Sequence, residues 1–306
     1  MRDIEEIRLY NNLEMYARFN RAKELEEALK NVSDEMLNSV DPSGNTILHH
    51  AVRLGSDGID TVKILLNREN IKVNIPNNGK YTPLHFAANS GASKESIEIL
   101  KLLLAREDIN IDAQNWRKNT PLHLAAAGNF REGVKLLLER SQDPKKSLMI
   151  TNNIGETPLH NALEHLAKGS RTVVKTMIKY LKSKEIATIF NMPVIRGYHV
   201  DTETMMDIFR GYTMLQIAAV KNKLNIIPLL ITYGGDVETI NENIEKAVKL
   251  YKSFHKNTNI DEFEKVVNIG LEKWQERNMK RQNKSLSSSI DRFIVNLQVY
   301  NYVWHV

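Results

Sequence analysis

Four histidines recur at nearly regular intervals, and imidazole is the side chain that most often moves protons or binds transition metals in proteins. Each follows a threonine by three residues, and the four are His49, His85, His123 and His160. They could supply metal ligands, or each could form hydrogen bonds within its own part of the chain. Gln216 takes the fifth equivalent position, and an amide is a poor zinc ligand. The pattern therefore favours a structural role, and we expect no metal ion and no cofactor.

Catalytic signatures do not accompany these histidines. The chain has no Gly-x-Ser-x-Gly, no His-Glu-x-x-His and no glycine-rich phosphate loop. It also lacks cysteine, which excludes a thiolate nucleophile and cysteine-based metal centres. His255 precedes acidic residues at 261, 262 and 264, which could act as an acid–base pair or simply favour a helix start. We predict that the protein is not an enzyme and has no catalytic residues.

Two basic stripes could contact an anionic partner. One comprises Arg171, Lys175, Lys179 and Lys182, whose spacing places them on one face of a helix. The other is the better candidate for a weak anionic contact and comprises Lys273, Arg277, Lys280, Arg281 and Lys284. Each stripe fits a solvated helix face, or a contact with an acidic protein, nucleic acid or anionic membrane. The net charge of +5 combines an acidic segment at residues 1–40 with a modest basic excess over the long remainder, so we expect no specific nucleic-acid binding.

The histidines belong to internal repeats. The hexapeptide Thr-Pro-Leu-His-x-Ala occurs at residues 82–87, 120–125 and 157–162, with weaker copies at 46–51 and 213–218. The five threonines lie 36, 38, 37 and 56 residues apart. Threonine suits a helix N-cap and proline the first helical position, so each copy predicts a sharply started helix.

At these residues the sequence resembles the ankyrin-repeat family, in which this motif opens the first of two antiparallel helices. The resemblance implies an all-α ankyrin-repeat solenoid of helix–turn–helix units with β-turn fingers. It also implies that each histidine holds neighbouring turns together through local hydrogen bonds. The family's usual repeat is about 33 residues long, so every unit here carries an insertion.

Further residues agree with helix pairs stacked in this way. Small alanines at 87–88, 125–126 and 218–219 would let neighbouring helices approach closely. Apolar residues at helical spacing predict a second helix in each unit: Val62, Leu65, Leu66; Leu100, Leu103, Leu104; Val134, Leu137, Leu138; Val174, Met177, Ile178; Ile226, Leu229, Leu230. The turns between helices often need a positive φ, which fits Gly55, Gly91, Asn129 and Asn222. Pro228 is expected in the first turn of the second helix of the fifth repeat, where proline is tolerated.

The predicted organisation has three parts. Residues 1–40 form an N-terminal helical cap, residues 41–240 hold about five ankyrin repeats, and residues 241–306 form a C-terminal helical extension. The irregular stretch 182–207 predicts a loop with a short extra helix, which is either functional or a surface excursion. The segment 290–306 is apolar and aromatic, and fits a helix or a strand.

Ankyrin arrays bind partners through the finger tips and the exposed side of the first helix, so the resemblance implies a protein-binding surface. Aromatic residues are unexpected in exposed turns and common at binding hot spots. The alternative is that some of them fold back onto their own array. The predicted partner-binding residues are Tyr81, Trp116, Arg117, Asn119, Phe209, Arg210 and Tyr212 in the fingers, with Phe86, Asn89 and Leu124 in the first helices.

These observations favour a non-enzymatic scaffold that binds another protein. A competing hypothesis is an effector whose array positions a C-terminal activity or membrane anchor, because ankyrin arrays occur in many proteins that intracellular bacteria deliver into host cells. The N-terminal residues lack the pattern of a secretory signal, and no apolar stretch reaches the roughly 20 residues of a transmembrane helix. We expect no transmembrane segment, and a location in the cytoplasm or, after delivery, in a host cell.

Overall fold

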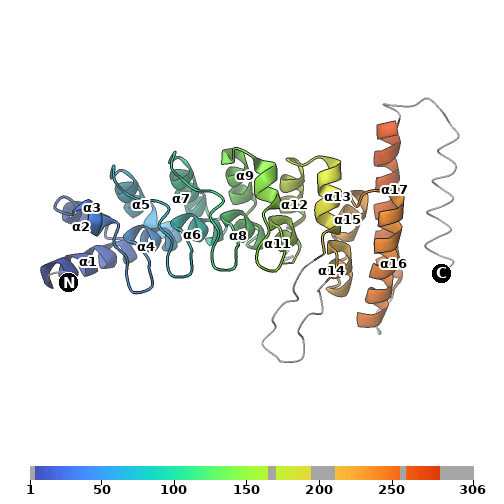
Figure 1. The fold of residues 1–306 in the computed structure, drawn as a ribbon, viewed down its shortest axis with the longest axis horizontal. Helices are drawn as coiled ribbons and strands as arrows, with labels where there is room; N and C mark the ends of the chain where they lie inside the picture. The colour runs from blue at the N-terminus through green and yellow to red at the C-terminus, as the bar shows by residue number, and fades with distance from the viewer. Residues whose placement is uncertain (1–3, 165–169, 194–210, 256–259, 283–306) are drawn as a thin grey trace. The chain divides into compact units, whose positions relative to one another are not determined.

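The computed structural model describes residues 4–164, 170–193, 211–255 and 260–282, and all regular secondary structure in these ranges is helical (Figure 1). The predicted all-α fold is confirmed. The chain divides into two compact units, each described by itself. The first comprises residues Met1–Asn153 and Thr157–Met177, and the second Ile154–Glu156 and Ile178–Val306.

Three helices begin the first unit: α1 (Ile4–Arg18), α2 (Ala22–Leu29) and α3 (Asp34–Leu37). They agree with the predicted N-terminal helical cap and bury an apolar stripe, with Leu13, Ala17, Leu25 and Leu29 at most 2% exposed. The intervening glutamates of α2 are exposed. Helix α1 packs on the first helix of the next pair, so this segment covers the apolar end of the stack.

The first helices of successive pairs lie in one row, with the finger loops extending from it in Figure 1. They are α4 (Ile47–Arg53), α6 (Pro83–Asn89), α8 (Pro121–Ala127) and α11 (Pro158–Glu164). Thr46, Thr82 and Thr120 are their N-caps, as predicted, and Pro83 and Pro121 occupy the first turn. The alanines at 87–88 and 125–126 are buried where α6 packs on α8 and α8 on α11. Their small side chains permit this close approach.

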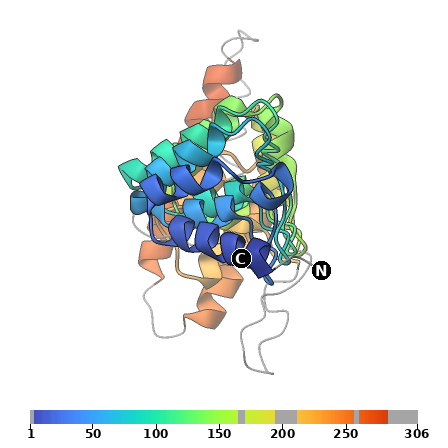
Figure 2. The ribbon, with the colours of Figure 1, turned by 90° about the vertical axis from the view of Figure 1, so that its left-hand side faces the viewer.

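The second helices form a second row: α5 (Ile59–Leu66), α7 (Lys94–Leu104), α9 (Arg131–Arg140) and α12 (Ser170–Ile178). A short 3₁₀ helix (Gly55–Gly58) precedes α5, and α10 (Pro144–Met149) follows α9. Gly55, Gly91 and Asn129 have positive φ angles of 61°, 88° and 53° in the turns between first and second helices. The predicted turn chemistry is therefore confirmed. Figure 2 shows the first unit from its N-terminal end, with the finger loops following one another along one edge.

The second unit contains α13 (Ser183–Asn191), α14 (Met214–Val220), α15 (Ile227–Thr232), α16 (Val237–Phe254) and α17 (Asp261–Gln282). Helix α14 packs on α16, and α15 on α17. Gly270 permits the second contact, because a Cβ there would lie 2.8 Å from the Cβ of Ile231. Pro228 lies in the first turn of α15, as predicted, and Asn222 has a φ of 51°.

Helix α13 is the short extra helix predicted within residues 182–207, of which 194–207 lie outside the described residues. The apolar segment 290–306 also lies outside them. Its expected conformation stays a prediction.

Candidate binding surface on the finger loops

A side-chain oxygen at the base of each finger fixes the turn. Asp41 Oδ1 accepts hydrogen bonds from the backbone N–H groups of residues 43 and 45, both at 2.8 Å. Asn77 and Asn115 repeat this arrangement with the residues two and four positions later, at 2.9–3.0 Å. These bonds satisfy the backbone inside the turn, so residues at the tip are free to vary.

Neighbouring fingers are joined through their backbones. The N–H of Asn78 donates to the carbonyl of Ser43 at 3.0 Å, and the N–H of Trp116 donates to the carbonyl of Gly79 at 3.0 Å. The N–H of Asn153 donates to the carbonyl of Arg117 at 2.9 Å. The fingers therefore present their side chains at fixed spacing.

The recurring histidines connect each first helix to the following finger. In His85, Nδ1 accepts from the N–H of Thr82 at 3.1 Å, and Nε2 lies 3.0 Å from the carbonyl oxygen of Asn119. His49 makes the same two contacts with the N–H of Thr46 and the carbonyl of Tyr81, each at 3.0 Å. Burial lowers the pKa of both rings to about 4, so both are neutral with the proton on Nε2. The predicted structural role is confirmed for these two rings.

Glutamine takes this role at the fifth position. Gln216 Oε1 accepts from the N–H of Thr213 at 3.1 Å, and its Nε2 lies 3.3 Å from Asn243 Oδ1 on α16. An amide can replace the imidazole because the position needs one acceptor and one donor.

Asparagine side chains form a second link between fingers, and one of these links is missing. Asn77 Nδ2 donates to Asn45 Oδ1 at 2.9 Å, and Asn152 Nδ2 donates to Asn119 Oδ1 at 3.0 Å. The position of the acceptor is occupied by Tyr81 in the intervening finger. Asn115 is only 2% exposed, and its Nδ2 has no hydrogen-bond partner. A buried donor without a partner costs about 1–3 kcal/mol, so tyrosine at position 81 gives up a hydrogen bond that asparagine would make.

The aromatic residues of this region differ in exposure. Tyr81 is half-buried, with its ring 5.7 Å from the rings of Phe86 and His85. Trp116 at the next finger tip is 55% exposed, and the Arg117 guanidinium lies 4.6 Å from its ring centroid. Tyr81 thus packs on its own array, as the sequence allowed, whereas Trp116 presents its indole to solvent.

Comparison with family models identifies the repeats. A model of ankyrin repeats in three copies matches residues 13–115 and 91–188, which together cover more than half of the chain. The chain belongs to the ankyrin-repeat family. Ankyrin repeats are general protein–protein interaction modules. A search of curated proteins gives no match to this chain.

The other predicted partner-binding residues of the ankyrin units have varied surroundings. Asn89 is exposed, and Leu124 and Tyr212 are half-buried. Asn119 is half-buried and accepts bonds from Asn152 and His85, so its polar groups serve the stack. Phe209 and Arg210 lie outside the described residues.

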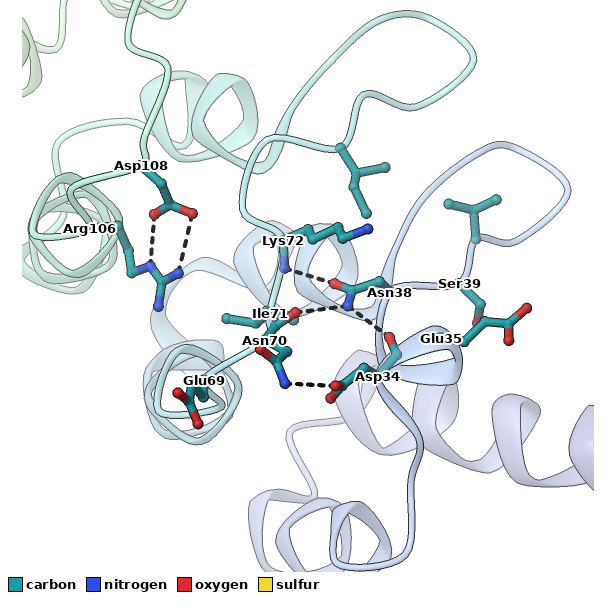
Figure 3. A pocket seen from close by; sticks show the side chains of 12 residues that line it. Asp34, Glu35, Asn38, Ser39, Glu69, Asn70, Ile71, Lys72, Arg106 and Asp108 are labelled. Carbon is teal, nitrogen blue, oxygen red and sulfur yellow. Dashed lines mark hydrogen bonds and ion pairs between the residues drawn. The ribbon is translucent and has the colours of Figure 1, made fainter.

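A groove of about 770 Å³, lined by both polar and apolar side chains, lies between the loops that follow α3, α5 and α7 (Figure 3). Asn38 spans two of these loops: its Nδ2 donates to the carbonyl of Asn70 at 2.9 Å, and its Oδ1 accepts from the N–H of Lys72 at 2.7 Å. Asn70 Nδ2 donates to Asp34 Oδ2 at 2.6 Å, and Arg106 pairs with Asp108 at 3.0 Å. The side chains of Asn38 and Asn70 therefore join neighbouring loops of this groove, and the Arg106–Asp108 pair lies within one loop.

The sequence did not reveal one cluster of potential metal ligands. Glu14, Asp41 and His50 place their ligand atoms within 4.8 Å of one another. His50 Nε2 lies 3.1 Å from Asp41 Oδ2, and Arg18 Nε donates to His50 Nδ1 at 3.3 Å. Both ring nitrogens are occupied, and the guanidinium would repel a cation. We assign the cluster to the attachment of α1 to α4.

The residues of α16 and α17 considered for chemistry also have structural partners. His255 Nε2 lies 2.9 Å from the carbonyl oxygen of Val220 at the end of α14. Arg277 donates to Ser183 Oγ at 2.6 Å and lies 3.6 Å from the ring centroid of Tyr233. Lys273 is exposed, whereas Lys284 and the side chains of Lys280 and Arg281 lie outside what the structure describes.

No helix in the described ranges is long and apolar enough to cross a bilayer.

Proposed function

We propose that the protein is a scaffold that binds a partner protein through the fingers and first helices of its first unit, with Trp116 at the centre. Trp116 is a large apolar side chain held out at a finger tip, where a structural role would favour a small polar residue. Tryptophan and arginine are enriched at the centres of protein interfaces. The exposed Trp116–Arg117 pair is the observation that carries this proposal.

Tyr81 adds independent support. An asparagine there would give Asn115 Nδ2 the acceptor that its counterparts in Asn77 and Asn152 have. Departures from a repeated structural pattern are often found at functional sites, and Tyr81 is such a departure, although its ring also packs on Phe86. Phe86 and Leu124, on the first helices behind the fingers, would extend the contact with half-buried apolar surface.

Affinity capture from cells of the source organism tests the proposal. The full chain, the Trp116→Ala variant and the Phe19→Ala variant are used as baits, and bound proteins are quantified by mass spectrometry. Phe19 is a matched control because it is an aromatic residue, 70% exposed, outside the proposed surface.

We expect at least one protein to bind the unchanged chain and Phe19→Ala equally, and to bind Trp116→Ala at least about tenfold less. Both variants should keep the melting temperature of the unchanged chain within a few degrees, because each truncated ring is exposed. Equal capture by all three baits would contradict the proposal.

The competing proposal, an effector with a C-terminal activity or anchor in residues 241–306, has no comparable support. Helices α16 and α17 pack on α14 and α15, and their buried residues include Tyr251, Phe263 and Trp274. This packing favours a capping role. Deletion of residues 283–306 leaves the cap in place and should leave folding and capture intact. Loss of a membrane or host-cell effect on this deletion, with capture unchanged, would favour the effector.

A further inference from the structure

The first three finger tips of the surface proposed above, and the first helices behind them, carry cations and no acids. Three segments hold the finger tips and first helices of the first three pairs, residues 42–53, 78–89 and 116–127. They contain four basic side chains, Arg53, Lys80, Arg117 and Lys118, and no aspartate or glutamate. The segments between and after them, 54–77, 90–115 and 128–152, together contain eleven acidic and eleven basic side chains. The fingers and first helices therefore form a positive stripe on an otherwise balanced unit.

The positive stripe and the balanced segments also differ in ion pairing. Among the balanced segments, Lys135 lies 3.4 Å from Glu132 and Arg106 lies 3.0 Å from Asp108. All four cations of the positive stripe are exposed, and none lies within 4.0 Å of a carboxylate of the described residues. Their charges are available to an incoming partner.

Two of these cations occupy positions that favour glycine. Lys80 and Lys118 have φ angles of 58° and 59°, and the equivalent residues of other fingers are Gly44, Gly155 and Gly211, with φ of 80–84°. A side chain at such a φ is strained relative to glycine. The chain thus places a positive charge at two adjacent fingers against the local conformational preference. Strain of this kind is common at functional sites.

We infer that the partner binds as an acidic protein segment, with carboxylates against Lys80, Arg117 and Lys118 and an apolar side chain against Trp116. This inference rests on the proposed function. Arginine and lysine meet carboxylates with charge-assisted hydrogen bonds, and complementary charge speeds encounter and rejects wrong partners. A protein segment fits better than a nucleic acid, because Phe86, Leu124 and Ala127 add half-buried apolar side chains to the adjoining first-helix surface. Phosphate backbones instead select dense clusters of cations.

Selection from random dodecapeptides displayed on phage tests the inference, with the immobilised full chain as target. A synthetic peptide with the enriched sequence is then titrated by fluorescence anisotropy against the unchanged chain and three variants. These are Trp116→Ala, the finger variant Lys80→Gln/Arg117→Gln/Lys118→Gln, and the control Lys63→Gln/Lys72→Gln/Lys101→Gln. The control makes the same change in net charge at exposed lysines outside the positive stripe. An oligodeoxythymidine of similar length is titrated in parallel.

We expect the enriched peptides to contain more Asp and Glu than Lys and Arg. The finger variant should bind about tenfold more weakly and the control less than about twofold, since each exposed ion pair contributes little alone. Circular dichroism melts of both triple variants establish that they are folded.

Each other outcome is informative. If the enriched peptides are neutral or basic but still need Trp116, or if no peptide is enriched, the inference of an acidic segment is wrong. The proposed binding surface is then tested by the capture experiment alone. Tighter binding of the oligonucleotide than of the peptide assigns the stripe to nucleic acid. Peptides that bind Trp116→Ala as well as the unchanged chain contradict this surface altogether.

Discussion

The first unit has a finger side, formed by the loops that precede the first helices, and a loop side, formed by the loops that follow α3, α5 and α7. Both sides are joined by the same kind of hydrogen bond, but they differ in charge and in how regular those bonds are. On both sides asparagine side chains join neighbouring turns: Asn77 bridges two fingers, and Asn38 and Asn74 bridge successive loops. On the loop side, charges are balanced and the bonds continue from one loop to the next (Figure 3). On the finger side, one asparagine acceptor is replaced by Tyr81, and the exposed Trp116 has the Arg117 guanidinium 4.6 Å from its ring centroid. The departures from the repeating pattern are therefore on the side that we propose binds a partner.

Acid should loosen the finger side first, since its links pass through buried imidazoles. His49 and His85 have pKa values of about 4 when folded, against 6.5 for an unperturbed ring. The folded chain binds fewer protons between these values, so the free energy of unfolding falls as the pH drops from 6.5 to 4. The loss is up to about 3 kcal/mol for each ring. Urea titrations at a series of pH values measure it.

A variant that replaces both rings with glutamine is the control for this pH dependence. It should have a flatter stability profile over the same interval, because the amide does not titrate. A slope unchanged by the double substitution would assign the pH dependence to other groups.

Removing one link from each side compares their strengths. His85→Ala should lower the free energy of unfolding by about 2–3 kcal/mol, because it leaves the buried N–H of Thr82 unpaired and removes one of the two hydrogen bonds to the carbonyl of Asn119. Asn74→Ala should cost about 1 kcal/mol, since its bonds lie near the surface. Denaturant unfolding gives both values. His85→Gln should recover part of the loss, as Gln216 does at the fifth position.

The missing finger link can be restored by substitution. Tyr81→Asn should be more stable than Tyr81→Ala by about 1 kcal/mol, because only asparagine offers an acceptor to Asn115 Nδ2. The difference should vanish when both substitutions are made in an Asn115→Ala chain. A difference that persists there would mean that the gain has another source.

The smallest effect is expected from glycine at a strained finger position. Lys80→Gly should raise the free energy of unfolding by ~0.5 kcal/mol, because φ is positive there and glycine relieves the strain. Gly44→Ala is the opposite control: its new Cβ would lie 2.6 Å from the backbone nitrogen of Asn78. Chemical denaturation should therefore show a gain in the first variant and a loss in the second.

The fold could be predicted from local signals that each unit repeats. Threonine N-caps, prolines in the first turn and positive-φ residues at Gly55, Gly91 and Asn129 are found where the sequence places them. Each depends on the backbone within a few residues, so a single sequence is sufficient. The second helices follow from the spacing of their buried apolar residues.

The exposure and hydrogen bonding of the candidate site residues depend on contacts between neighbouring repeats, which no local sequence pattern contains. Tyr81 and Trp116 look alike as finger aromatics, yet one packs on Phe86 and the other is exposed. Asn115 Nδ2 is unpaired because the previous repeat has tyrosine, and not asparagine, at position 81. Aligning the fingers position by position would have exposed that mismatch.

The histidine contacts have a consequence for how such a chain can gain or lose repeats in evolution. His49 and His85 each cap their own helix and reach the carbonyl just before the next threonine. The joint between these neighbours is therefore the same, whatever the tip residues are. A block running from one threonine to the next can be duplicated or lost with both joints intact, so unit number and tip chemistry are free to evolve separately.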